Sequence, residues 1–155
     1  MSAETCPECG AVVAGGGPGC HALLEELNYE ALQNPRIASV YILAFDTYCM
    51  QHVETYCVSA KSYAAHLTRL CIGVEHNGDQ AIYAALQRWY HGGLTKPEVL
   101  DHRGTIRLVD VQKVDDVEGK VARIREWARH VWDVYASQHE RARGWIEEAL
   151  NQKRR

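Results

Sequence analysis

The fold is decided by the stretch PRIASVYILAFDTYCMQH, residues 35–52. Its apolar residues recur at the spacing of one face of an α-helix; they are Ile37, Val40, Tyr41, Ala44, Phe45 and Tyr48. Ile42, Leu43 and Met50 cover much of the remaining circumference. A helix that is apolar on nearly every side belongs in the middle of a bundle. We therefore expect an α-helical protein with this helix at its centre.

Helical periodicity continues on both sides of that stretch. Upstream, apolar residues repeat at helical spacing over 20–34, and Pro35 ends that helix and starts the next. Downstream, the pattern predicts a helix over about 59–76 that ends at Asn77-Gly78, and another over about 79–92. These segments place at least three further helices around the central one.

In the C-terminal part of the chain, helical periodicity is not continuous. Between Gly93 and Asp116 the periodicity fades, and the segment allows a short helix, an extended stretch or a lone strand. From Val117 onward one apolar stripe predicts either one long helix or two helices with a break near Ser137. Strands do not alternate with helices, and no repeat or glycine-rich phosphate motif occurs. The predicted fold class is all-α, a bundle of about five helices with an N-terminal CxxC metal knuckle.

The knuckle is the sequence Cys6-Pro-Glu-Cys9-Gly10, followed after ten residues by Cys20-His21. Two thiolates in a C-x-x-C turn can point at one metal ion, and the glycine behind them lets backbone N–H groups approach the sulfurs. A disordered tail or a redox dithiol is the alternative, but a thioredoxin-like pair needs a helix opening at it. Residues 1–19 are therefore predicted to be a knuckle and a flexible Gly-rich tether, in the same domain as the bundle of residues 20–155.

A tetrahedral zinc site needs a fourth ligand besides Cys6, Cys9 and Cys20. The histidines that could supply it are the adjacent His21 and the distant His52, His66 and His139. Adjacent residues can both ligate only where the chain turns sharply, which disfavours His21 at a helix start. His52 closes the central helix, so its imidazole can point past the helix end. We predict a zinc site of Cys6, Cys9, Cys20 and His52, with His21 as the alternative ligand.

A second set of candidates lies on the predicted helices. A buried carboxylate without a partner is costly, so Asp46 needs an imidazole, an arginine, a helix N-terminus or a metal. His66 borders the apolar face of its helix, and His139 lies within the apolar stripe of the last helix. A lone histidine at such a place is more often a hydrogen-bonded core residue. Together, however, Asp46, His66 and His139 could converge as a three-ligand catalytic site in the bundle core.

Composition limits the classes of partner and the cellular compartment that we expect for this protein. The 155 residues include 17 basic and 20 acidic side chains, with a pI near 6.2, which gives no reason to expect nucleic acid or an anionic membrane as a partner. The N-terminus lacks a signal-peptide pattern and no apolar run is long enough to span a membrane, so a cytoplasmic protein is expected. In that compartment Cys49, Cys57 and Cys71 are expected as small buried residues rather than disulfides.

The ordered motifs resemble a known family. They are Cys6-Pro-x-Cys9-Gly, Cys20, Asp46-x-Tyr48-x-x-Gln51-His52, His66-Leu67, Trp127, Trp132 and His139. In this order they are similar to a family of small bacterial proteins of unknown function, from Cys6 to about Trp145. The resemblance implies a helical, metal-binding protein and supplies no reaction.

Two functions are compatible with these observations. The first is a binding module, in which zinc fixes the N-terminal segment to the bundle and the protein contacts an unidentified protein or small-molecule partner. The second is a metal-dependent hydrolase or transferase, broadly similar to helical-bundle thiol transferases, that uses Asp46, His66 and His139 beside Tyr48 and Gln51. Whether catalysis accompanies metal binding is left open by the sequence.

Overall fold

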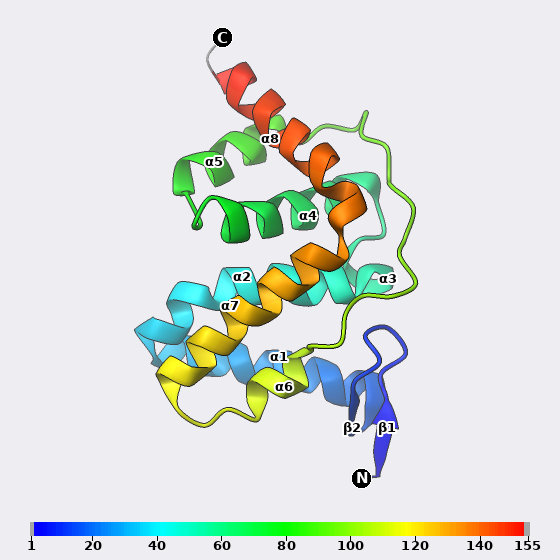
Figure 1. Cartoon of the computed structure of the whole chain (residues 1–155), viewed down its shortest axis with the longest axis vertical. Coiled ribbons are helices and arrows are strands. Elements are labelled where there is room, and N and C mark those ends of the chain that lie inside the picture. The colour runs from blue at the N-terminus through cyan, green and yellow to red at the C-terminus, as the bar shows by residue number, and fades with distance from the viewer. Residues whose placement is uncertain (1, 154–155) are drawn as a thin grey trace.

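The computed structural model describes residues 2–153 and shows an α-helical protein with one small hairpin (Figure 1). The predicted all-α class is therefore confirmed. In chain order the elements are β1 (Ala3–Thr5), β2 (Val12–Ala14), α1 (Gly16–Gln33), α2 (Pro35–Gln51), α3 (Val53–Tyr56), α4 (Ala60–Glu75), α5 (Gln80–Trp89), α6 (Leu108–Gln112), α7 (Val117–Val134), a 3-10 turn η1 (Ala136–Gln138) and α8 (His139–Lys153).

Helix α2 occupies the centre, as its sequence predicts. It packs against α1, α4 and α7, and Figure 1 shows α7 lying alongside it. Its start is fixed by Asn34, whose Oδ1 accepts hydrogen bonds from the backbone N–H groups of Arg36 (2.9 Å) and Ile37 (3.4 Å). Ile37 and Met50 are almost fully buried, and each such side chain contributes about 1.5–3 kcal/mol of hydrophobic stabilisation.

The helices after α2 begin and end where local sequence signals place them. Ser59 caps α4 through its side chain, which accepts from Ser62 N at 3.0 Å. Helix α4 ends at a turn where Asn77 and Gly78 have φ of 51° and 71°, as the predicted glycine C-cap requires. Asp79 then caps α5, accepting from Ala81 N at 2.8 Å.

The last helical stretch is divided, in agreement with the second of the two predicted alternatives. The N–H of Tyr135 donates to the carbonyls of Val131 (3.2 Å) and Trp132 (3.0 Å), which tightens the end of α7 into η1. The Tyr135 hydroxyl anchors this turn by donating to Met50 O at 2.6 Å. The break redirects α8 onto α4 and α5 (Figure 1).

The N-terminal segment is more ordered than predicted. Strands β1 and β2 pair antiparallel, with Ala3 opposite Ala14, and α1 begins at Gly16 rather than at residue 20. The predicted tether is wrong in this respect, because most of it forms the first turn of α1. A Cβ atom on Gly19 would lie 1.7 Å from the Ala14 carbonyl oxygen. Here glycine allows the helix to contact β2 closely instead of serving as a flexible link.

Residues 93–116, whose structure the sequence left open, contain the short helix α6 preceded by an irregular segment. That segment runs along one side of the molecule from α5 to α6 (Figure 1). The buried side chain of Gln51 holds it by donating from Nε2 to the carbonyls of Arg103 (2.9 Å) and Ile106 (2.8 Å). Within residues 2–153, none of the helices combines the length and apolar character that a membrane span needs.

Candidate metal centre

Four predicted ligands from three separate segments meet at one point. Cys6 and Cys9 lie between β1 and β2, Cys20 lies near the start of α1, and His52 follows the last residue of α2. Their Sγ and Nε2 atoms all lie within 4.8 Å of one another, and all four residues are buried. The structure thus brings together the four residues that the sequence proposes as a metal site.

The hairpin tip holds the first two thiols in a tight turn. Cys6 N donates to Ala11 O at 2.7 Å, and Gly10 N donates to Cys6 O at 2.9 Å. Gly10 has φ of 80°, a conformation that favours glycine, and the turn places Ala11 N 3.5 Å from the Cys9 sulfur. The backbone N–H that the CxxCG pattern was expected to offer the sulfurs is therefore present.

His52 is oriented by the end of helix α2. Its Nδ1 lies 2.7 Å from Tyr48 O, so Nδ1–H donates to this carbonyl and the Nε2 lone pair faces the sulfurs. The ring also stacks on Tyr48, with centroids 3.7 Å apart and planes 14° apart. A backbone carbonyl that fixes the tautomer in this way is typical of histidines that bind metals.

The spacing of the donor atoms fits a tetrahedral ion. Zinc bonds sulfur at about 2.3 Å and imidazole nitrogen at about 2.0 Å, which puts two sulfurs about 3.8 Å apart and sulfur and nitrogen about 3.5 Å apart. The Cys9 and Cys20 sulfurs are 3.7 Å apart, and His52 Nε2 lies 3.6 Å from the Cys6 sulfur and 3.4 Å from the Cys20 sulfur. These three distances match a tetrahedral site, and all four donor atoms lie close enough together for one divalent cation.

The electrostatics of the cysteines favour a cation. The hydrogen bond from Cys9 to Cys20, together with burial, raises the pKa of Cys9 to about 12, and the same bond lowers the pKa of Cys20. The Tyr48 hydroxyl supports the Cys20 thiolate by donating to its sulfur at 3.6 Å. Three thiolates this close repel one another unless a cation lies between them, so metal binding would release protons from the cluster.

Charged residues that the sequence did not single out hold the hairpin tip in place. Glu8 accepts from Thr55 N (3.1 Å) and from Thr55 Oγ1 (2.7 Å) in α3. Arg103, in the irregular segment, donates to Glu8 O at 3.2 Å and pairs with Glu54, and this pair lowers the pKa of Glu54 to about 2. Arg107 Nε donates to Cys9 O at 2.6 Å. Helical periodicity could not reveal these arginines, because their segment has no regular structure.

His21, the alternative fourth ligand, lies outside the group of four. Its side chain is 51% exposed and its Nδ1 is 3.6 Å from Glu25 Oε1. It borders a cavity of about 310 Å³ that also reaches Cys6 and His52. His52 and not His21 therefore completes the cluster in this structure.

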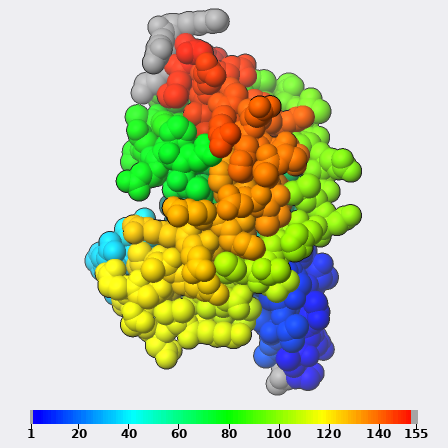
Figure 2. All heavy atoms as spheres, in the orientation of Figure 1, coloured from blue at the N-terminus to red at the C-terminus, as the bar shows by residue number. Residues whose placement is uncertain are grey.

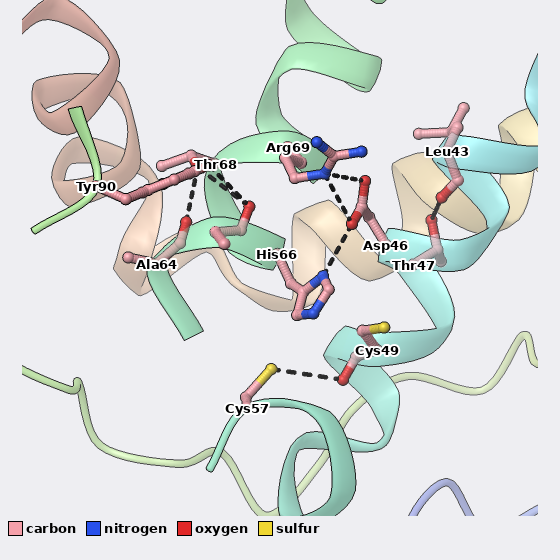
Figure 3. A network of polar contacts seen from close by, with 11 residues as sticks. Leu43, Asp46, Thr47, Cys49, Cys57, Ala64, His66, Thr68, Arg69 and Tyr90 are labelled. Atoms are coloured by element: carbon pink, nitrogen blue, oxygen red, sulfur yellow. Dashed lines mark hydrogen bonds and ion pairs between the residues drawn. The ribbon is translucent and has the colours of Figure 1, made fainter. Parts of the chain in front are cut away.

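The second predicted set is brought together only in part (Figure 3). The fully buried Asp46 on α2 accepts from His66 Nδ1 at 2.9 Å and from Arg69 Nε at 3.3 and 3.1 Å, both on α4. Asp46 thus has two of the expected partners, an imidazole and an arginine. His139 lies elsewhere, with its Nε2 2.7 Å from Trp132 O and its ring stacked on Trp132 at 3.9 Å.

Because of this placement, Asp46, His66 and His139 are not among the groups of three potential metal ligands found within residues 2–153. A catalytic role for these residues stays a prediction. The other such group is Cys71, Glu75 and His76, but the Glu75 carboxylate already accepts from Arg143 (2.8 and 2.5 Å) and from Trp132 Nε1 (2.9 Å).

The remaining cysteines behave as small core residues. Cys49, Cys57 and Cys71 are free and fully buried, as expected. Burial raises the pKa of Cys57 and of Cys71 to about 12, so both are protonated at neutral pH.

Comparison with known proteins gives one result. A family model described as "Family of unknown function (DUF5946)" matches residues 4–136. The match includes Cys6, Cys9, Cys20 and His52, and it ends before His139. Neither a search of curated proteins nor a search of solved structures gives a match.

Proposed function

Since the chain belongs to the DUF5946 family, whose function is unknown, we propose a role from its own residues: a zinc-binding helical protein in which the metal fastens the N-terminal segment to α2. The observation that carries the proposal is the convergence of Cys6, Cys9, Cys20 and His52 within 4.8 Å, with the His52 tautomer fixed by Tyr48 O. Each of the three joined segments supplies at least one ligand.

Zinc is the metal that suits this donor set. Three thiolates and one imidazole in a tetrahedral arrangement are a common structural zinc site, whereas magnesium and calcium prefer oxygen donors. In a reducing cytoplasm the thiols would stay available for metal, and no disulfide joins the cysteines of residues 2–153.

The same donor set supports a binding role rather than metal catalysis. Four protein ligands leave no open position for water or substrate, which is the usual difference between structural and catalytic zinc sites. The bound ion would contribute a fixed geometry for the hairpin. The protein would then act by contact with a protein or small-molecule partner, and its near-balanced charge argues against nucleic acid or a membrane surface as that partner.

The alternative, a metal-dependent hydrolase or transferase, has weaker support. It needs Asp46, His66 and His139 to share one ion, but Asp46 is engaged by His66 and Arg69, and His139 Nε2 is engaged by Trp132 O. The observations therefore favour the binding module.

Elemental analysis of protein purified under reducing conditions tests the proposal. We expect one zinc per chain in the wild type, and loss of that zinc in Cys9→Ser and in His52→Ala. His21→Ala is the matched control, because it removes an imidazole beside the same cavity. Replacement of zinc by cobalt should give the absorption of a tetrahedral thiolate site in the wild type and in the His21 variant. Zinc retained by His52→Ala but lost by His21→Ala would overturn the assignment.

A further inference from the structure

A second site candidate lies away from the metal centre, towards the other end of α2. A cleft of about 710 Å³ is enclosed by α2, α4, α5 and α7, and Figure 2 shows it as a hollow between the green surface of α5 and the yellow to orange surface of α7. It includes Ile42, ten residues before His52, which is about 15 Å along a helix. Its volume is typical of small-molecule sites.

Two arginines in this cleft form no ion pair with the described residues. Arg125 and Arg129 are one turn apart on α7, are exposed, and make no hydrogen bond or ion pair with any group in residues 2–153. Other arginines of the chain differ in this respect: the ones that pair with a carboxylate include Arg36, Arg103, Arg123 and Arg143. Arg125 and Arg129 are thus two of the unpaired arginines of residues 2–153, and both line this cleft, whereas Arg88 and Arg141, also unpaired, lie outside it.

A third arginine is positioned rather than free. Asp46 accepts from Arg69 Nε, and the guanidinium carbon lies 5.0 Å from the centroid of the Tyr83 ring. The side chain is 31% exposed, and its terminal nitrogens make no hydrogen bond with the described residues. Figure 3 shows Arg69 Nε directed at the Asp46 carboxylate. A guanidinium fixed on one side by a buried carboxylate presents its remaining donors with little loss of side-chain entropy.

The rest of the cleft suits an apolar body. Leu43, Val74 and Tyr83 line it, and Ile42 is 47% exposed there. Gly73 keeps α2 and α4 close at this point, because a Cβ on it would lie 2.4 Å from Leu43 Cδ1. A ligand with an apolar group could cover this surface and gain hydrophobic stabilisation.

The charges in the cleft define the polar group of the ligand. Asp46 offsets Arg69, and Glu75, which also lines the cleft, is offset by Arg143. Arg125 and Arg129 add two positive charges that no ion pair within residues 2–153 neutralises; Glu118, whose pKa is lowered by Arg36 and also by Arg125, is itself paired with Arg36. We propose that this cleft binds a small organic phosphate, namely a phosphate monoester with an apolar or aromatic body. A monoester carries about two negative charges at neutral pH and three acceptor oxygens, which match two free guanidinium groups and the donors of Arg69.

Calorimetry with phenyl phosphate as the probe tests this proposal in the zinc-loaded protein. The double variant Arg125→Glu/Arg129→Glu should weaken binding by about tenfold or more, since it replaces two attractions with two repulsions. The control Lys61→Glu/Arg88→Glu changes the net charge equally at two exposed positions outside the cleft, and its affinity should stay within about twofold of the wild type.

Benzoate and inorganic phosphate separate the contributions of the two parts of the ligand. Both should bind more weakly than phenyl phosphate, because benzoate has one charge and inorganic phosphate has no apolar body. The proposal is overturned if the wild type does not bind phenyl phosphate, if both double variants lose affinity equally, or if benzoate binds as tightly. Because zinc content is measured separately, failure here leaves the metal assignment intact.

Discussion

Helix α2 carries two buried polar clusters that differ in where their partners come from. At its C-terminal end, His52 meets three cysteines from the β-hairpin and the start of α1. In its second half, Asp46 meets His66 and Arg69, both on the neighbouring long helix α4. The first cluster joins a small segment to the bundle, whereas the second lies between elements that already pack together. The same helix thus uses polar contacts both to attach a segment and to satisfy a buried charge within its core.

Metal removal should have the largest effect and should act locally. Structural zinc contributes on the order of 10 kcal/mol in small zinc-binding peptides, which exceeds what the other contacts of the hairpin, the buried Ala11 and Val13 and the hydrogen bonds of Glu8 and Arg107, are expected to contribute. After zinc chelation we expect the amides of residues 2–20 to lose most of their protection from hydrogen exchange. The buried amides of α2, α4 and α7 should keep theirs, because these three helices pack against one another.

Hydrogen exchange measured by mass spectrometry on zinc-loaded and chelated protein would resolve this difference. A uniform loss of protection across all helices would show that the metal supports the whole bundle and would remove the contrast between the two clusters. His21→Ala, treated in the same way, serves as the control.

Asp46→Asn should have an intermediate effect on the whole bundle. The amide keeps the shape of the side chain but removes the charge that pairs with Arg69. A buried charge left without its partner lowers the free energy of unfolding by about 2–4 kcal/mol. We expect a smaller decrease here, because Arg69 is partly exposed. Urea unfolding of the zinc-loaded protein would measure the loss. Asp133→Asn, at an exposed position of α7, should change stability by no more than about 0.5 kcal/mol. Loss of zinc from the Asp46 variant would contradict the independence of the two clusters.

Acidification should have the smallest effect on stability. It concerns the ion pair of Glu75 with Arg143, which belongs to neither of the two clusters. This pair lowers the pKa of Glu75 to about 2 from an ordinary value of 4.5. Its stabilisation is therefore complete above pH 4.5 and is lost as the pH falls towards 2. Because the pair is partly exposed, we expect about 1 kcal/mol. Zinc-free wild type and Glu75→Gln should differ in stability at pH 6 and converge near pH 2; a constant difference would contradict the assignment.

Local signals in the sequence were sufficient for most of the fold and for the group of four donors. Cys6 and Cys9 are recognisable from their spacing and from Gly10, and His52 from its place just after the helix that Pro35 begins. The break near Ser137 was one of two predicted alternatives. The α1 start at Gly16 was missed, because glycines between two motifs usually indicate a flexible link, whereas here α1 packs on β2 so closely that a Cβ on Gly19 would clash with Ala14 O.

Features that depend on the arrangement of several helices could not be predicted in this way. Asp46 was expected to have an imidazole or arginine partner, but the choice of His66 and Arg69 depends on how α4 crosses α2. His139 lies on the predicted apolar stripe, yet the turn at η1 directs its ring to Trp132 instead of the bundle centre. In the sequence, Arg125 and Arg129 resemble an ordinary solvated helix face, because the cleft beside them forms only when α7 packs against α2 and α4.

If a metal ion attaches the hairpin, the stability of this part of the fold depends on the concentration of free metal. Cys6 and His52 are 46 positions apart in the sequence. A permanent crosslink across such a loop would lower the entropy of the unfolded chain by the equivalent of about 4 kcal/mol at 25 °C. A metal bridge is reversible, and its stabilisation grows by about 1.4 kcal/mol for each tenfold rise in free metal above the dissociation constant. Under the zinc proposal, the folded fraction of residues 2–20 would therefore follow the zinc concentration around the protein.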